Sequence, residues 1–145
     1  MDYRSGNLGR VFLLRLDDGD DLHACLRELI AREKIESGWF QVFGGLRRAE
    51  VVTGPREPVA PPEPVWHTMD EAREILGLGS VYSEGDEPRI HLHAAMGHHG
   101  DTLTACVRKD AQVYLVLEVL FYELTGFTVI RPWNPEWGFN RLTFA

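Results

Sequence analysis

The spacing of apolar residues changes along the first third of the chain. Residues 10–16 (RVFLLRL) form a short apolar run of the kind found in β-strands. From Asp20 to about Lys34 the apolar residues recur at the spacing of one helical face, and they are Leu22, Cys25, Leu26, Leu29 and Ile30. Acidic residues stand at the start of this segment and basic residues at its end, as the helix dipole favours. The pattern predicts a strand followed by one long helix.

The rest of the chain has mainly the pattern of strands. Residues 39–52 are predicted as strand with a bend or bulge at Gly44-Gly45, where no Cβ stands in the way. Residues 69–79 are ambiguous, because propensity favours a helix with Asp70 as its cap. Further strands are predicted at 90–96, 102–107, 113–124 and 127–130, with a tight turn at Thr125-Gly126, and residues 141–144 would close the sheet.

These elements predict an α+β fold in a single domain of residues 1–145. Its mainly antiparallel sheet would pack with at least one long helix. Residues 1–9 are expected to form a flexible N-terminus. Residues 54–66 hold five of the eight prolines and are expected to form a surface loop, because proline cannot donate to a strand ladder.

The overall charge excludes several classes of partner. The chain has 15 lysines and arginines against 22 acidic residues, for a net charge of −7, which disfavours general binding to nucleic acid. No apolar run reaches the ~20 residues of a spanning helix, and the N-terminus lacks the layout of a signal peptide. The two cysteines suit a reducing compartment. A soluble, cytoplasmic protein without membrane contact is expected.

Candidate chemistry lies in a histidine-containing hairpin between residues 89 and 107. In a strand, residues two apart share a face, so His91 and His93 project together. If residues 98–101 form the turn, paired residues have numbers that add up to 199, and Cys106 lies directly opposite His93. Two His and one Cys with an open fourth position is a zinc arrangement. A register slip by one residue would turn Cys106 to the other face.

Other interpretations stand beside the zinc site. The three side chains could simply pack together, and a mixed nitrogen and sulfur set also accepts copper or nickel. No catalytic set is recognisable, and solvent-exposed turn positions are expected for His98 and His99. Glu118 interrupts an apolar strand and is either a site or interface carboxylate or an outward-facing residue, with Arg15 as a possible ion-pair partner.

The order of motifs resembles the PPC domain (plants and prokaryotes conserved domain, DUF296). The resemblance runs from about Arg10 to Phe144, and its most specific part is the stretch PRIHLHAAMG. The less specific stretches are VFLLRL, VFGGLRRAEV, EILGLGS, VYLVLEVLFYEL and FTVIRP.

The resemblance implies a trimer and a metal site. In prokaryotic members a third histidine, within Gly-Gly-His-Leu, joins the two strand histidines. This chain matches at His91 and His93 and has Thr104-Ala105-Cys106-Val107 at the third position. The exchange either keeps the site, with cysteine as a softer ligand, or abolishes it. Plant members carry AT-hook segments, and no Arg-Gly-Arg-Pro stretch occurs here.

Three functions follow as hypotheses. The first is a trimeric zinc-binding domain with a non-enzymatic binding or regulatory role and His91, His93 and Cys106 as ligands. The second is a small metal-dependent enzyme that uses the open position of the same site. The third is a DNA-associated regulator, which rests on family analogy and is disfavoured by the acidic charge.

Overall fold

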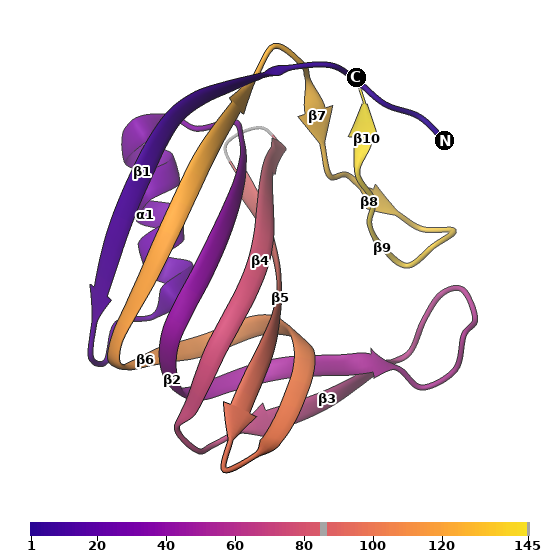
Figure 1. The fold of residues 1–145 in the computed structure, drawn as a ribbon. Coiled ribbons are helices and arrows are strands. Elements are labelled where there is room, and N and C mark those ends of the chain that lie inside the picture. Colours follow the sequence, from indigo (N-terminus) through magenta and orange to yellow (C-terminus); the bar gives the residue numbers. More distant parts are fainter. Residues whose placement is uncertain (85–86, 145) are drawn as a thin grey trace.

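Six strands form one antiparallel sheet in a computed structural model that describes residues 1–84 and 87–144. The strands are β1 (Asn7–Asp17), β2 (Ser37–Pro55), β3 (Pro64–Met69), β4 (Arg73–Glu84), β5 (Glu87–His98) and β6 (Asp101–Thr125). Their spatial order is β1-β6-β5-β4-β2-β3, and β6 also pairs with β2. This extra pairing links β2, β4, β5 and β6 in a closed circuit (Figure 1).

The predicted α+β class with a long helix is wrong. Strands make up 66% of the chain and helix only 9%. The single described helix, α1 (Leu22–Glu33), has 12 residues and lies against one face of the sheet (Figure 1). Residues 69–79, which propensity favoured as a helix capped by Asp70, lie mostly in β4, because β2 and β5 pair with this segment on both sides. Tertiary pairing overrides the weak helix preference of an isolated segment.

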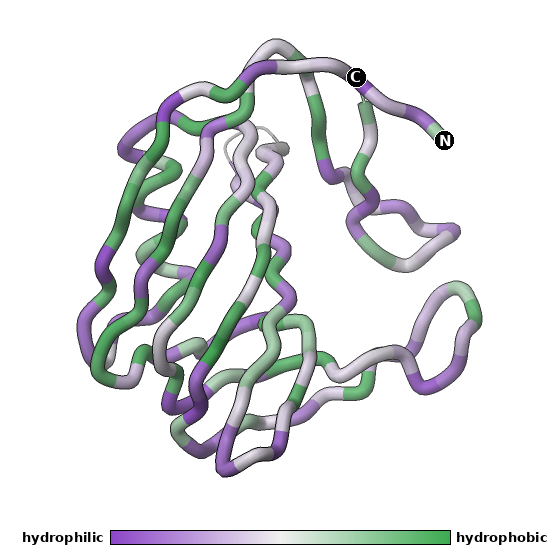
Figure 2. The backbone as a smooth tube through the Cα atoms, in the orientation of Figure 1, coloured by the Kyte–Doolittle hydropathy of each residue, from purple (hydrophilic) through white to green (hydrophobic). Residues whose placement is uncertain are grey.

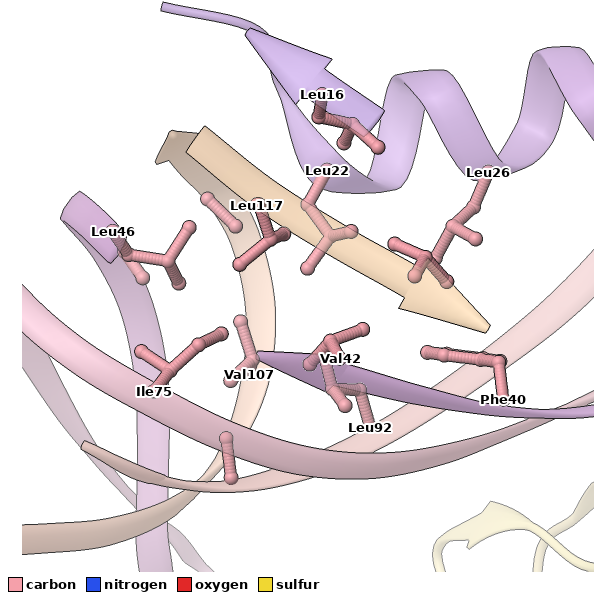
Figure 3. Close-up of a cluster of buried hydrophobic side chains, with 14 of the residues drawn as sticks. Leu16, Leu22, Leu26, Phe40, Val42, Leu46, Ile75, Leu92, Val107 and Leu117 are labelled. Atoms are coloured by element: carbon pink, nitrogen blue, oxygen red, sulfur yellow. The ribbon is translucent and has the colours of Figure 1, made fainter. Parts of the chain in front are cut away.

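Helix α1 lies within the predicted segment, and Leu22, Leu26 and Ile30 of the predicted face are buried while Cys25 and Leu29 are partly buried. Its N-cap is Asp21, whose carboxylate accepts a hydrogen bond from the backbone N–H of Ala24. It ends at Lys34, which adopts a left-handed conformation with φ 54°. Leu22, Leu26 and Ile30 point into the core between helix and sheet, where Figure 3 shows the first two beside Leu16, Phe40 and Leu117.

Two long strands bend so that the circuit can close. The predicted bend at Gly44-Gly45 is confirmed, since the pairing of β2 with β6 shifts register there and Gly44 has φ 134°. A Cβ at Gly44 would come within 2.4 Å of the carbonyl oxygen of Val116. The segments 102–107 and 113–124, predicted as separate strands, belong to the single strand β6.

The C-terminal segment does not extend the main sheet. Strand β7 (Val129–Ile130) pairs with β10 (Thr143–Phe144), so the prediction that residues 141–144 close the main sheet is wrong. Strand β8 (Trp133–Asn134) pairs with β9 (Phe139–Asn140) in another small sheet. Gly126, in the predicted turn, has φ 84°, but the strand after it turns away from β6 and lies beside β4.

The strands alternate between two faces, which Figure 2 shows as a change between hydrophobic and hydrophilic colours along the tube. One face, with Phe40, Val42, Leu92, Leu117 and Phe121, is buried in the core. The opposite face is named here the outer face. The proline-rich segment runs through the exposed connection between β2 and β3. No helix among the described residues is long and apolar enough to cross a membrane.

Candidate metal centre

The hairpin of β5 and β6 has the predicted register. His93 pairs with Cys106 and Gly97 with Thr102. His98 pairs with Asp101, which leaves His99 and Gly100 as the two turn residues, with φ 47° and 90°. Two positive φ angles in a two-residue turn match the right-handed twist of a hairpin. This local geometry keeps His93 and Cys106 opposite each other.

All three predicted ligand residues project from the outer face. They alternate with Leu92, Ala94 and Ala105, which belong to the core. His91 Nε2 lies 3.1 Å from His93 Nε2, and the two rings meet edge to face. One ligand atom from each of His91, His93 and Cys106 lies within 4.8 Å of the others. Among the described residues this is the only such group of three or more potential ligands.

The donor set fits a tetrahedral zinc ion. With Zn–N and Zn–S bonds of about 2.0–2.3 Å, ligand atoms around zinc lie roughly 3.3–3.8 Å apart. The two imidazole nitrogens are already near this spacing. The thiol of Cys106 comes from the directly paired strand position, and its sulfur lies within 4.8 Å of the imidazole ligand atoms.

The electrostatic environment keeps the imidazole of His91 neutral. Burial, together with the charges of Arg131, His93 and Arg108, lowers the pKa of His91 to about 4. A neutral imidazole has a free lone pair for a metal at neutral pH. Burial raises the pKa of the Cys106 thiol, while the nearby Arg108 and Arg131 oppose that rise. A metal would therefore have to displace the thiol proton as it binds.

Sequence reasoning missed Arg131, which lies at the site from the far end of the chain. Arg131 Nη1 lies 3.3 Å from His91 Nδ1, and Nη2 donates to Ser80 Oγ at 2.9 Å. Ser80 is the direct partner of His91 in the pairing of β4 with β5. Because Arg131 reaches the site only through the packing of the C-terminal segment beside β4, no local spacing in the sequence could have identified it.

The other residues singled out from the sequence lie apart from the three ligands. His98 contacts Ala72 and Glu71 at the other end of the hairpin. Glu118 is exposed on the outer face. It pairs in register with Arg15, as the ion-pair hypothesis requires, yet the Arg15 guanidinium contacts Asp17 at 3.0 Å.

Solved structures of similar fold include proteins from several organisms. A metal-containing protein from Archaeoglobus fulgidus has a TM-score of 0.86 and 24% identity, with 99% of each chain covered. A plant- and prokaryote-conserved protein from Pyrococcus horikoshii has a TM-score of 0.81 and 20% identity, with 97% of each chain covered. A protein from Bacteroides thetaiotaomicron, provisionally called DNA-binding, has a TM-score of 0.79 and 18% identity over 96% of this chain and 97% of its own.

These structural similarities support the fold alone. The family is assigned from a match of the sequence to a family profile. No curated protein matches the chain. The sequence profile of the Plants and Prokaryotes Conserved domain matches residues 3–125, which include β1 to β6 and all three candidate ligands. The match ends before Arg131 and the C-terminal small sheets. The resemblance inferred from PRIHLHAAMG is therefore confirmed, and this chain belongs to the Plants and Prokaryotes Conserved (PCC) domain family.

Proposed function

We propose that this PCC domain binds one zinc ion through His91, His93 and Cys106 and acts as a homotrimeric binding or regulatory module. The observation that carries the proposal is the convergence of two imidazoles and one thiol from paired strands of one hairpin. A metal-containing relative in Archaeoglobus fulgidus adds support. Zinc is favoured because it accepts nitrogen and sulfur ligands in tetrahedral geometry.

A non-enzymatic role is favoured by what surrounds the ligands. The charged side chains that act on Cys106 are Arg108 and Arg131, and they also act on His91. Hydrolysis by a metal-bound water would require a general base, whereas the charges that act on these two ligands come from arginines and a histidine. The net charge of −7 equally disfavours a role in DNA association. The free cysteines Cys25 and Cys106 suit the cytoplasm as its location.

The trimer is supported by the apolar character of the outer face. Leu13, Phe43, Leu76 and Leu78 lie on it with 52–76% of their surface exposed. Strand pairing joins Leu78 directly to His93, so the apolar surface adjoins the candidate metal centre. A groove of about 450 Å³ lies where the apolar surface meets the candidate metal centre. Its lining includes Phe43, Leu76, Leu78, His93 and Thr104. Contiguous exposed apolar surface of this kind marks an interaction site, and a second copy of the chain is its proposed occupant.

The metal content of the purified protein tests the zinc site. Elemental mass spectrometry on protein made without a His-tag is expected to find about one zinc per chain. The variants His91→Ala and Cys106→Ser are each expected to lose most of it, whereas His67→Ala, at an exposed histidine of β3, is expected to retain it. Metal-free wild-type protein, or equal zinc in all four proteins, would show that the three side chains only pack together.

A further inference from the structure

A half-buried arginine beside the candidate metal centre has no acidic partner. Among the described residues, no carboxylate forms an ion pair with Arg131, and its two terminal nitrogens contact neutral groups on His91 and Ser80. Its Nε is buried without any hydrogen-bond partner. The guanidinium also lies over the ring of Tyr82, with Cζ 5.2 Å from the ring centroid. A buried cation without a counterion is costly, which indicates that a negative group belongs here.

A second arginine, Arg108, adds positive charge near the candidate metal centre. Arg108 is exposed and stands two residues from Cys106 on β6, and its charge acts on both Cys106 and His91. The site is therefore locally positive in a chain whose net charge is −7. Zinc held by two neutral imidazoles and one thiolate would add one further positive charge. The described protein groups around the site do not neutralise the positive charge of the two arginines and the metal together.

We propose that this centre binds a small ligand through an oxyanion group, a carboxylate or a phosphate, which Arg131 holds next to the metal. The planar guanidinium of arginine suits two-point binding of carboxylate and phosphate, and such paired charges form stronger hydrogen bonds than a guanidinium forms with a neutral hydroxyl or imidazole. Three protein ligands also leave zinc with an open fourth position. The contact between the anion and the metal rests on the proposed zinc site. The contact between the anion and the protein rests on Arg131 alone.

Calorimetric titration at constant ionic strength tests the inference, with inorganic phosphate and acetate as the two probes and chloride as the balancing anion. At least one probe is expected to bind the zinc-loaded protein with one site per chain. Tighter binding of phosphate would indicate a phosphate ligand, and tighter binding of acetate would indicate a carboxylate ligand. Arg131→Gln is expected to weaken that binding about ten-fold or more while the zinc content stays at the wild-type level. Arg131→Lys keeps the positive charge but loses the planar, two-point guanidinium. Its anion affinity is expected to lie between those of the wild-type protein and Arg131→Gln.

Two further variants separate the anion contact from folding and from general charge. Arg108→Gln changes an exposed side chain and is expected to weaken binding by a smaller factor. Arg56→Gln, in the connection between β2 and β3, removes the same charge at a side chain that is paired with Glu63 and is expected to have no effect. Failure of both probes to bind wild-type protein, or unchanged binding in folded Arg131→Gln, would overturn the inference. If purified wild-type protein contains no zinc and still binds the anion, the metal proposal alone is refuted and the anion contact stands.

Discussion

A buried histidine of helix α1 shows how burial controls protonation at single residues. His23 is only 4% exposed, and burial lowers its pKa despite the opposing charge of Asp21. In the unfolded chain the same imidazole has its ordinary pKa of about 6.5. As the pH falls below this value, the unfolded state takes up a proton that the folded state resists. The free energy of unfolding therefore falls with the pH, and the contribution is fully present only above about pH 6.5.

Replacement of this histidine tests the residue-scale argument. His23→Leu is expected to reduce the loss of stability between pH 7 and pH 5, by at most about 1.4 kcal/mol per pH unit for one proton. Urea unfolding at both pH values measures the difference. His91 has a lowered pKa as well and keeps part of the pH dependence in this variant. An unchanged slope in His23→Leu would show that His23 is protonated in the folded protein.

Helix α1 depends on a single cap and on its apolar face at the scale of the element. The Asp21 carboxylate accepts from the Ala24 backbone N–H at 2.8 Å, and Leu22, Leu26 and Ile30 bury the inner side of the helix. Isolated helices of 12 residues are marginal in water, so packing against β5 and β6 supplies most of the stability. The cap adds a smaller, separable contribution, because it satisfies one backbone donor at the first turn.

Removal of the cap is expected to cost about 1 kcal/mol of unfolding free energy in Asp21→Ala. Glu28→Ala, at an exposed position that pairs with Arg32, is the matched control and is expected to change stability by less than about 0.5 kcal/mol. Urea unfolding at pH 7 compares the three proteins. Equal losses in both variants would show that the measured effect is one of surface charge and not of capping.

The outer face becomes a single surface only at the scale of the whole molecule. Strand pairing aligns Leu13, Leu120, Gln41, Leu78, His93 and Cys106 in one row across six neighbouring strand segments. Residues 13 and 106 thus share a surface although they are far apart in the sequence. Because this row ends at the candidate metal centre, the proposed assembly and the proposed ligand binding would take place on the same surface.

A charge on this surface is expected to separate the subunits of the proposed trimer. Sedimentation of the wild-type protein should give about three times the chain mass of 16.5 kDa. Leu76→Asp, at a side chain that is 69% exposed, should shift the protein toward the monomer. Val59→Asp is the control, because it adds the same charge at an exposed apolar side chain in the connection between β2 and β3. A monomeric wild-type protein at micromolar concentration would refute the trimer.

The features that the sequence predicted correctly depend on contacts between near neighbours along the chain. The spacing of Leu22, Leu26 and Ile30 determined helix α1, and the glycine pair determined the bend of β2. The turn at His99-Gly100 set the register that brings Cys106 opposite His93. In each case the decisive interaction spans a turn of helix or a single hairpin, so a local pattern contains the information.

Only the tertiary structure decided the features that depend on distant pairings. Residues 69–79 became strand because β2 and β5 flank them, and propensity alone could not anticipate those partners. The pairing of β6 with β2 closed the sheet and left α1 as the one described helix. Arg131 reached His91 across 40 positions of sequence, because the C-terminal segment packs beside β4. The sequence by itself determined the candidate ligands, whereas the fold determined the positive charge around them.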